Sequence, residues 1–259
     1  GRGKSAALGI ACARLLQQSG DVELLLTAPR LSAVESVFSR VAALCPEAQH
    51  HGPAEVSLPN GSRLRFLPPD VLTEQIEQGT LGGSGSMLLV DEAAAIPASL
   101  LARWLVAFPR IAFATTVHGY EGSGRGFALR FRDVLDRQAP QWRELTLQTP
   151  IRWSAGDPLE AVIQQLLLLD APLPKAEPHQ GERLPSMVIS QAQLAEQVVL
   201  LEKLFGLLVQ SHYRTTPSDL RQLLDGPGSS LRMVLGSDGA DPQAVLVTRE
   251  EGGFEAALA

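Results

Sequence analysis

The sequence predicts an α/β fold in which helices cover a parallel sheet. Strand-like apolar runs alternate with stretches of helical periodicity between residues 22 and 169. The run from Met87 to Val90 is entirely apolar, as in a strand buried on both faces. Gly3-Lys4-Ser5 directly precedes a helical stretch rich in small residues, which is typical of a phosphate-binding loop. In such sheets ligands bind at the carboxyl ends of the strands.

Each element is predicted from its own local pattern. Strands are predicted where apolar residues run together or alternate between turn residues, and helices where apolar residues recur every three or four positions. The predicted strands are Val22–Thr27, Ser62–Leu67, Met87–Glu92, Arg110–Thr115 and Trp142–Leu147. The predicted helices are the stretch after Ser5, Leu31–Leu44, Val71–Gln78 with Asp70 as its cap, the helix opened by Pro97, and Asp157–Leu169.

The composition changes after Leu169. Residues 170–185 contain four prolines and three acidic residues but few apolar ones, as in a linker. An amphipathic stretch then begins near Ile189, and Leu231–Leu235 and Ala244–Thr248 form a predicted strand pair. We therefore predict a first domain at residues 1–170, a linker at 171–187 and the start of a second domain at 188–259.

The overall composition is that of an ordinary soluble globular protein. Of 259 residues, 45% are hydrophobic and 19% charged, and the longest apolar run, Leu166–Leu169, is far too short to cross a membrane. Cys12 and Cys45 have no metal-binding spacing and suit a cytosolic protein. The net charge of −6 excludes a chain that is basic throughout, but residues 103–152 are locally rich in arginine. That segment is either a solvated helix face or a surface that faces phosphate.

The chain opens on Gly1-Arg2-Gly3-Lys4-Ser5, the second half of the pattern G-x-x-x-x-G-K-[ST]. Glycines let backbone N–H groups approach phosphate oxygens, and the start of the following helix favours negative charge. Lys4 would contact the β- and γ-phosphates of ATP or GTP, and the Ser5 hydroxyl would bind Mg²⁺. The other half of the pattern and its preceding strand are missing, so we expect a piece of a longer protein.

Asp91 and Glu92 follow the apolar run directly and would lie at the carboxyl end of its strand. Asp91 can hold a hydrated Mg²⁺ ion, and Glu92 can orient or deprotonate a water molecule. Alternatively, the two acids only begin a helix, where negative charge is favoured. The Gly-Lys-Ser motif decides between these readings, and we predict Lys4, Asp91 and Glu92 as the catalytic residues.

A glycine-rich loop, Thr115–Phe127, leaves the next predicted strand. Thr115 and Thr116 could hydrogen-bond the γ-phosphate, and Arg125 could bind a phosphate of ATP or of RNA. The alternative is an ordinary surface loop, and for His118 we expect packing only. Arg152, after Pro150 and before Trp153, is a candidate for an arginine that stabilises the transition state, or else a surface ion pair.

These motifs together resemble the family of bacterial tRNA(Met) cytidine acetyltransferases. The resemblance is carried by Gly-Arg-Gly-Lys-Ser, Val90–Pro97, Thr115–Phe127 and Pro150-Ile151-Arg152-Trp153, and by His212–Arg221 in the second part of the chain. It implies a RecA-like, RNA-helicase-like ATPase domain that lacks its first strand, followed by the incomplete N-terminal part of a GNAT-like α+β acetyltransferase domain. It also implies that ATP hydrolysis and acetyl-CoA are used to N4-acetylate the wobble cytidine of elongator tRNA(Met).

By this resemblance, residues Gly1 to Ala6 and Arg152 bind ATP, and Asp91 and Glu92 have the usual magnesium and water roles. The acetyl-CoA site is expected outside these 259 residues, so the chain alone should not acetylate RNA. Two other classes stay open: a nucleic-acid-dependent ATPase or helicase without acetyl transfer, and a nucleotide-binding switch without turnover. Residues Lys4, Ser5, Asp91 and Glu92 argue against the switch, because a pure binder could lose Glu92.

Overall fold

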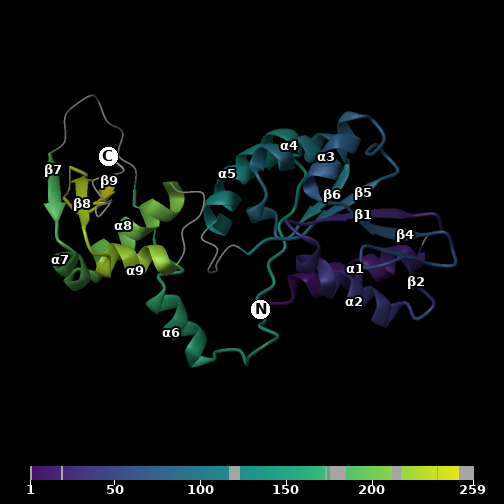
Figure 1. The fold of residues 1–259 in the computed structure, drawn as a ribbon, viewed down its shortest axis with the longest axis horizontal. Coiled ribbons are helices and arrows are strands. Elements are labelled where there is room, and N and C mark those ends of the chain that lie inside the picture. The colour runs from purple at the N-terminus through teal and green to yellow at the C-terminus, as the bar shows by residue number, and fades with distance from the viewer. Residues whose placement is uncertain are drawn as a thin grey trace, which may run out of the picture. The chain divides into compact units, whose positions relative to one another are not determined.

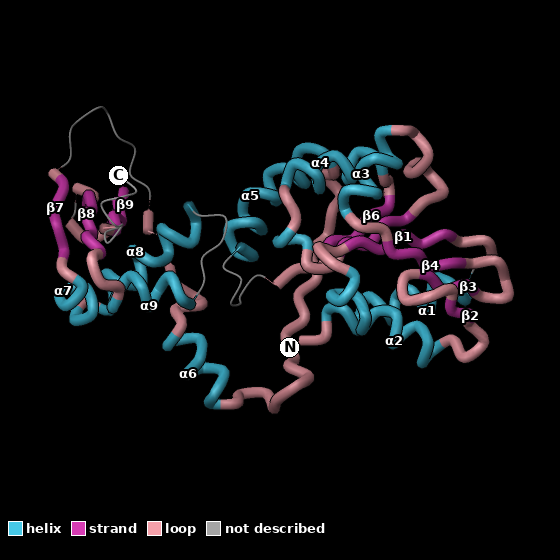
Figure 2. Tube along the Cα trace, in the orientation of Figure 1, coloured by secondary structure: helices cyan, strands magenta, loops and turns pink. Residues whose placement is uncertain are grey.

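The computed structural model describes residues 2–18, 20–116, 123–172, 174–175, 185–211, 217–237 and 239–250. The chain forms two compact units, which can be followed by element in Figure 1 and by secondary structure in Figure 2. The first unit comprises residues 1–117 and 127–157, and the second comprises residues 118–126 and 158–259.

The first unit is built on a six-stranded sheet with the order β2-β3-β4-β1-β5-β6. Four of the strands are parallel, and β2 and β3 add an antiparallel hairpin at one edge. The predicted parallel sheet is therefore confirmed. The strands are β1 (Glu23–Thr27), β2 (Gln49–His50), β3 (Glu55–Ser57), β4 (Arg63–Phe66), β5 (Met87–Val90) and β6 (Arg110–Phe113).

Helices cover both faces of this sheet (Figure 1). One face carries α1 (Lys4–Gln18) and α2 (Glu35–Leu44), and the other carries α3 (Pro69–Glu77), α4 (Ala98–Ala107) and α5 (Ser123–Gln138). Short 3₁₀ helices span Leu31–Val34 and Ala93–Ala95. Because both faces are covered, β1 divides its leucines between two cores: Leu24 and Leu26 pack in one and Leu25 in the other. This burial explains why the three middle residues of β1 and all four residues of β5 are apolar.

The strand predicted at Trp142–Leu147 does not form, and that prediction is wrong. Leu145 is 92% exposed, and the Trp142 side chain donates instead to Asp136 on α5, with Nε1 2.7 Å from Oδ1. No described strand pairs with this segment. A sequence with the alternating pattern of a strand does not form one unless a neighbouring strand is present to accept and donate its backbone hydrogen bonds. Asp70 lies in the first turn of α3, but the N-cap residue is Pro68, so the predicted cap is also wrong.

The second unit contains a three-stranded antiparallel sheet with the order β7-β8-β9. Its strands are β7 (Ser186–Ile189), β8 (Ser229–Leu235) and β9 (Pro242–Arg249), so the predicted strand pair is confirmed. Ser190 and Gln193 form a capping box that begins α7. Leu194, Leu204 and Leu231 are central to the core of this unit. Its helices are α6 (Pro158–Leu166), α7 (Gln191–Glu196), α8 (Val198–Ser211) and α9 (Pro217–Asp225).

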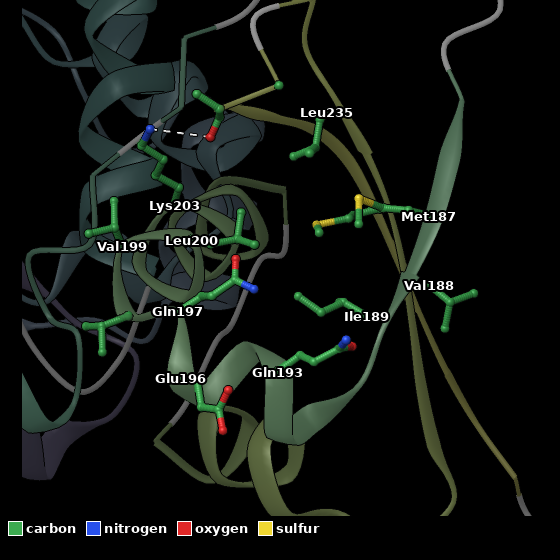
Figure 3. Close-up of a pocket in the computed structure, with 14 residues that line it drawn as sticks. Met187, Val188, Ile189, Gln193, Glu196, Gln197, Val199, Leu200, Lys203 and Leu235 are labelled. Atoms are coloured by element: carbon green, nitrogen blue, oxygen red, sulfur yellow. Dashed lines mark hydrogen bonds between the residues drawn. The ribbon is translucent and has the colours of Figure 1, made fainter.

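A hollow of about 700 Å³ lies beside β7, β8 and α8 in the second unit (Figure 3). Apolar side chains such as Met187, Ile189 and Leu235 line most of it, and Lys203 lies at its side. Lys203 is held there by an ion pair with Asp241, with Nζ 2.6 Å from Oδ1. None of the helices in the described ranges is both long and apolar enough to cross a membrane.

Candidate nucleotide-binding site

The site begins where β5 ends. The Asp91 N–H donates to the Thr27 carbonyl on the neighbouring strand, at 2.9 Å, and the Asp91 carboxylate is fully buried. Ser5, in the first turn of α1, donates its hydroxyl to Oδ2 of Asp91 at 2.5 Å. The Glu92 N–H donates to the other carboxylate oxygen at 2.9 Å. Two motifs that lie 86 residues apart in sequence are thus in direct contact.

Burial raises the pKa of Asp91 above its ordinary value, and the neighbouring Glu92 charge acts in the same direction. The hydrogen bonds from the Ser5 hydroxyl and the Glu92 N–H oppose this rise, as does the charge of Lys4. Ionising a carboxylate that is buried in this way is costly. A divalent cation beside it would lower that cost.

Lys4 connects three parts of the site. Its Nζ donates to Oε1 of Glu92 at 3.2 Å and to Oγ1 of Thr116 at 2.8 Å. The two charged side chains are half-buried, with 24% of Lys4 and 31% of Glu92 exposed. Lys4 thus connects the phosphate loop to the residues that follow β5 and β6. A solvent-accessible ammonium group at this position can exchange its protein partners for phosphate oxygens.

Glu92 has a left-handed backbone conformation, with φ 50° and ψ 43°. Residues other than glycine seldom adopt this conformation, and it costs about 1–3 kcal/mol where surrounding structure enforces it. Here the next residue is fixed, because the Ala93 N–H donates to the Ala114 carbonyl beyond β6 at 3.0 Å. The strained turn directs the chain away from β5 immediately after Asp91.

The backbone of the candidate phosphate loop favours glycine at position 3. Gly3 has φ 79°, and its carbonyl accepts from the Ala7 N–H at 2.8 Å as α1 begins. Ala6 lies in the first turn of that helix. A Cβ atom on Gly3 would also overlap Cδ1 of Ile151, so the space is already filled. Gly1, the other predicted loop glycine, lies outside the described residues.

A second segment, residues 148–152, lies against this loop. The Arg2 side chain donates from Nε to the Gln148 carbonyl at 2.9 Å, and Ile151 touches Gly3. The predicted residue Arg152 is therefore next to a residue in contact with the loop. Arg152 is exposed, and within the described part of the chain it forms no hydrogen bond or ion pair. The surface ion pair that was the alternative role for Arg152 is not formed there.

The remaining predicted contacts have different outcomes. Thr116 is in the site through its bond to Lys4. Arg125 lies on α5, but its side chain is not described, and His118 and the rest of residues 117–122 lie outside the described residues. Sequence reasoning missed Gln148 and Ile151 as contacts of the loop. The Pro-Ile-Arg-Trp motif contained a signal for Ile151. An apolar residue directly before the candidate phosphate ligand Arg152 indicates a packing contact close to the site.

The Thr115 hydroxyl is buried, and no residue that the structure describes forms a hydrogen bond with it. Leaving such a group unsatisfied costs about 1–3 kcal/mol, so a missing partner is informative. The hydroxyl lies one residue from Thr116, which binds Lys4. The expectation that Thr115 hydrogen-bonds the γ-phosphate stays a prediction.

Replacing Thr115 with valine tests that expectation. Thr115→Val keeps the side-chain shape and removes the unsatisfied hydroxyl, so the nucleotide-free protein should gain about 1 kcal/mol of stability. ATP turnover should fall in the same variant. Thermal unfolding without nucleotide and steady-state ATP hydrolysis measure the two effects. Thr116→Val is the matched control, because it removes a hydroxyl that is already bonded and should not stabilise the protein. A lower unfolding midpoint in Thr115→Val would contradict the expectation.

Comparison with known proteins shows which proteins this chain is similar to. Residues 1–170 match the family described as RNA cytidine acetyltransferase NAT10/TcmA, helicase domain. A protein of Nitrosococcus halophilus named tRNA(Met) cytidine acetyltransferase TmcA is 47% identical over 98% of this chain and 33% of its own length. Proteins of the same name from Vibrio cholerae and Haloferax volcanii are 43% and 40% identical, over 89% and 97% of this chain. The chain spans about a third of the length of these relatives.

Proposed function

Because the chain belongs to the NAT10/TcmA family of RNA cytidine acetyltransferases, we propose that residues 1–170 bind and hydrolyse ATP. One observation carries this proposal: the phosphate loop and the acidic pair meet, through Ser5 with Asp91 and Lys4 with Glu92. A Gly-Lys-Ser triplet alone has little weight. When it joins two carboxylates at the end of a parallel strand, the groups needed for phosphoryl transfer to water are together.

In this proposal the loop residues Gly1 to Ala6 bind the phosphates of ATP. Lys4, Ser5 and Ala6 are the first residues of α1, a helix of 15 residues whose dipole favours negative charge at that end. Lys4 leaves Glu92 and Thr116 and binds the β- and γ-phosphates. Arg152, which has no described partner, approaches the same phosphates and stabilises charge in the transition state. Thr116 and Arg125 are proposed as further contacts to phosphate or to RNA.

The residues at the end of β5 fit Mg²⁺. The Ser5 hydroxyl and the Asp91 carboxylate are hard oxygen donors that already lie 2.5 Å apart, and Mg²⁺ commonly takes one or two protein oxygens together with phosphates and water. The described residues contain no cluster of three or more His, Cys, Asp or Glu side chains, so a metal cage made of protein alone is not present there. Mg²⁺ would supply charge neutralisation at the phosphates when ATP is bound.

Glu92 is proposed to orient the attacking water and accept its proton. In the described structure the Glu92 carboxylate is paired with Lys4, with Oε1 3.2 Å from Nζ. When Lys4 binds phosphate instead, this carboxylate oxygen becomes free to accept a hydrogen bond from the attacking water. ATP binding would thus release Glu92 from its partner in the nucleotide-free protein.

We propose further that the parent enzyme transfers an acetyl group from acetyl-CoA to N4 of the wobble cytidine of elongator tRNA(Met) in the cytoplasm. The relatives described above carry the name tRNA(Met) cytidine acetyltransferase, which supports this proposal. We assign residues 171–187 as a linker and residues 188–259 as the start of a GNAT-like domain. The order of one strand, three helices and two antiparallel strands in β7 to β9 supports that assignment.

The direct test uses the full-length protein. We expect it to form N4-acetylcytidine when incubated with unmodified elongator tRNA(Met), acetyl-CoA, ATP and Mg²⁺, as counted by nucleoside mass spectrometry. Omission of ATP should remove the product. If ATP hydrolysis is stimulated by RNA but no acetylcytidine forms, the acetyl-transfer part is wrong and an RNA-dependent ATPase remains. If ATP is bound but never hydrolysed, the chain is a nucleotide switch.

A further inference from the structure

Two contacts join the phosphate loop to residues 148–152, the segment that contains Arg152. The first contact is polar: Arg2 donates to the Gln148 carbonyl at 2.9 Å, so an arginine of the loop holds the backbone of the segment. The second is apolar: Ile151 occupies the space where any Cβ on Gly3 would lie. The contacts lie on either side of Pro150, which limits backbone freedom between them.

The Ile151 contact is unlike ordinary core packing. Ile151 is 69% exposed, and it belongs to none of the three hydrophobic cores of the described residues. An isoleucine in a core would be almost completely buried, as Leu24 and Leu88 are. Its aliphatic side chain instead lies over a loop residue whose backbone is expected to meet phosphate. Stability of the fold therefore does not account for this contact.

We propose that Arg2 and Ile151 are positioning residues that hold the 148–152 segment against the phosphate loop and thereby place Arg152 for the nucleotide. Arg152 directly follows Ile151, so its Cα cannot move far from Gly3 while Ile151 stays on that glycine. The guanidinium is thereby restricted before ATP arrives, which lowers the entropy that must be lost when it binds. This inference rests on the proposed ATP site and adds residues to it.

The test measures whether Ile151 acts through Arg152. Full-length protein, Ile151→Ala, Arg152→Ala and the double variant are titrated with the non-hydrolysable analogue AMP-PNP in the presence of Mg²⁺. We expect Ile151→Ala to weaken binding about fivefold when Arg152 is present and less than about twofold when Arg152 is alanine, because residues that act together are not additive. Ile151→Leu keeps an aliphatic contact and should restore most of the affinity.

Leu145→Ala is the matched control, because Leu145 lies in the same segment between α5 and α6, is 92% exposed and should not affect binding. Thermal unfolding of Ile151→Ala should match that of the parent, since the residue is outside the cores. Equal weakening by Ile151→Ala in both backgrounds would overturn the inference and leave the ATP site standing. If the parent binds no AMP-PNP, or if Lys4→Ala leaves binding unchanged, the proposed ATP site and this inference both fail.

Discussion

Glu92→Gln will still bind ATP, but its ATP turnover will fall by about 10²- to 10⁴-fold. Glutamine keeps the shape of the side chain but cannot accept a proton from water, and a general base contributes about this factor. Binding should persist or tighten, because Lys4 no longer has to leave a carboxylate at 3.2 Å before it binds phosphate. Steady-state ATP hydrolysis and AMP-PNP titration of the full-length protein measure the two quantities.

Glu77→Gln is the control for that experiment. Glu77 forms an ion pair with Arg103, and both side chains are about half exposed on helices α3 and α4, so its loss should change neither binding nor turnover. Unchanged turnover in Glu92→Gln would remove Glu92 from the mechanism. A parent protein without turnover would favour a nucleotide-binding switch.

Lys4→Ala will weaken AMP-PNP binding by roughly 10- to 100-fold and will abolish ATP-dependent acetylcytidine formation. The expected loss follows from the removal of one charged donor, since a hydrogen bond that involves a charged group is worth about 1.5–3 kcal/mol. The variant also leaves Asp91 and Glu92 as adjacent carboxylates without their neighbouring cation. Without that cation, the negative carboxylates should repel the incoming phosphates more strongly, which adds to the loss of affinity.

Lys203→Ala is the matched control for Lys4→Ala. Lys203 also forms an ion pair with a carboxylate, but in the second unit, where it bonds Asp241. Its replacement should leave AMP-PNP affinity unchanged. If Lys4→Ala bound AMP-PNP as tightly as the parent, the phosphate loop would not be the nucleotide site. If it lost binding but kept ATP-dependent acetylation, ATP would act elsewhere in the full-length protein.

Local patterns predicted the elements that are buried on both sides. The β1 and β5 strands could be predicted from sequence because every residue that faces either core must be apolar, and a short continuous apolar run between turn residues is typical of such a strand. The hairpin of β2 and β3 was not predicted, because two- and three-residue strands at an exposed edge leave no such pattern. The Trp142–Leu147 segment had the pattern but lacks a partner strand among the described residues.

The sequence by itself determined which residue types the site would contain. Two short motifs contain these residues: Lys4 and Ser5 directly precede or begin a helix, and Asp91 and Glu92 directly follow an apolar strand. The residues could therefore be found from their position next to a predicted element. Their roles remain proposals, but the contacts among them agree with the motifs.

Only the tertiary structure decided that Thr116 binds Lys4 and that Ile151 lies on Gly3. It also decided that the buried Thr115 hydroxyl has no hydrogen-bond partner among the residues described. The contacts of Lys4 and Gly3 join residues that are far apart in the chain, and Lys4 and Thr116 lie 112 positions apart in sequence. Such a contact cannot be predicted from the local pattern of apolar and polar residues. It depends on the order of the strands in the sheet, which determines where the connecting segments lie.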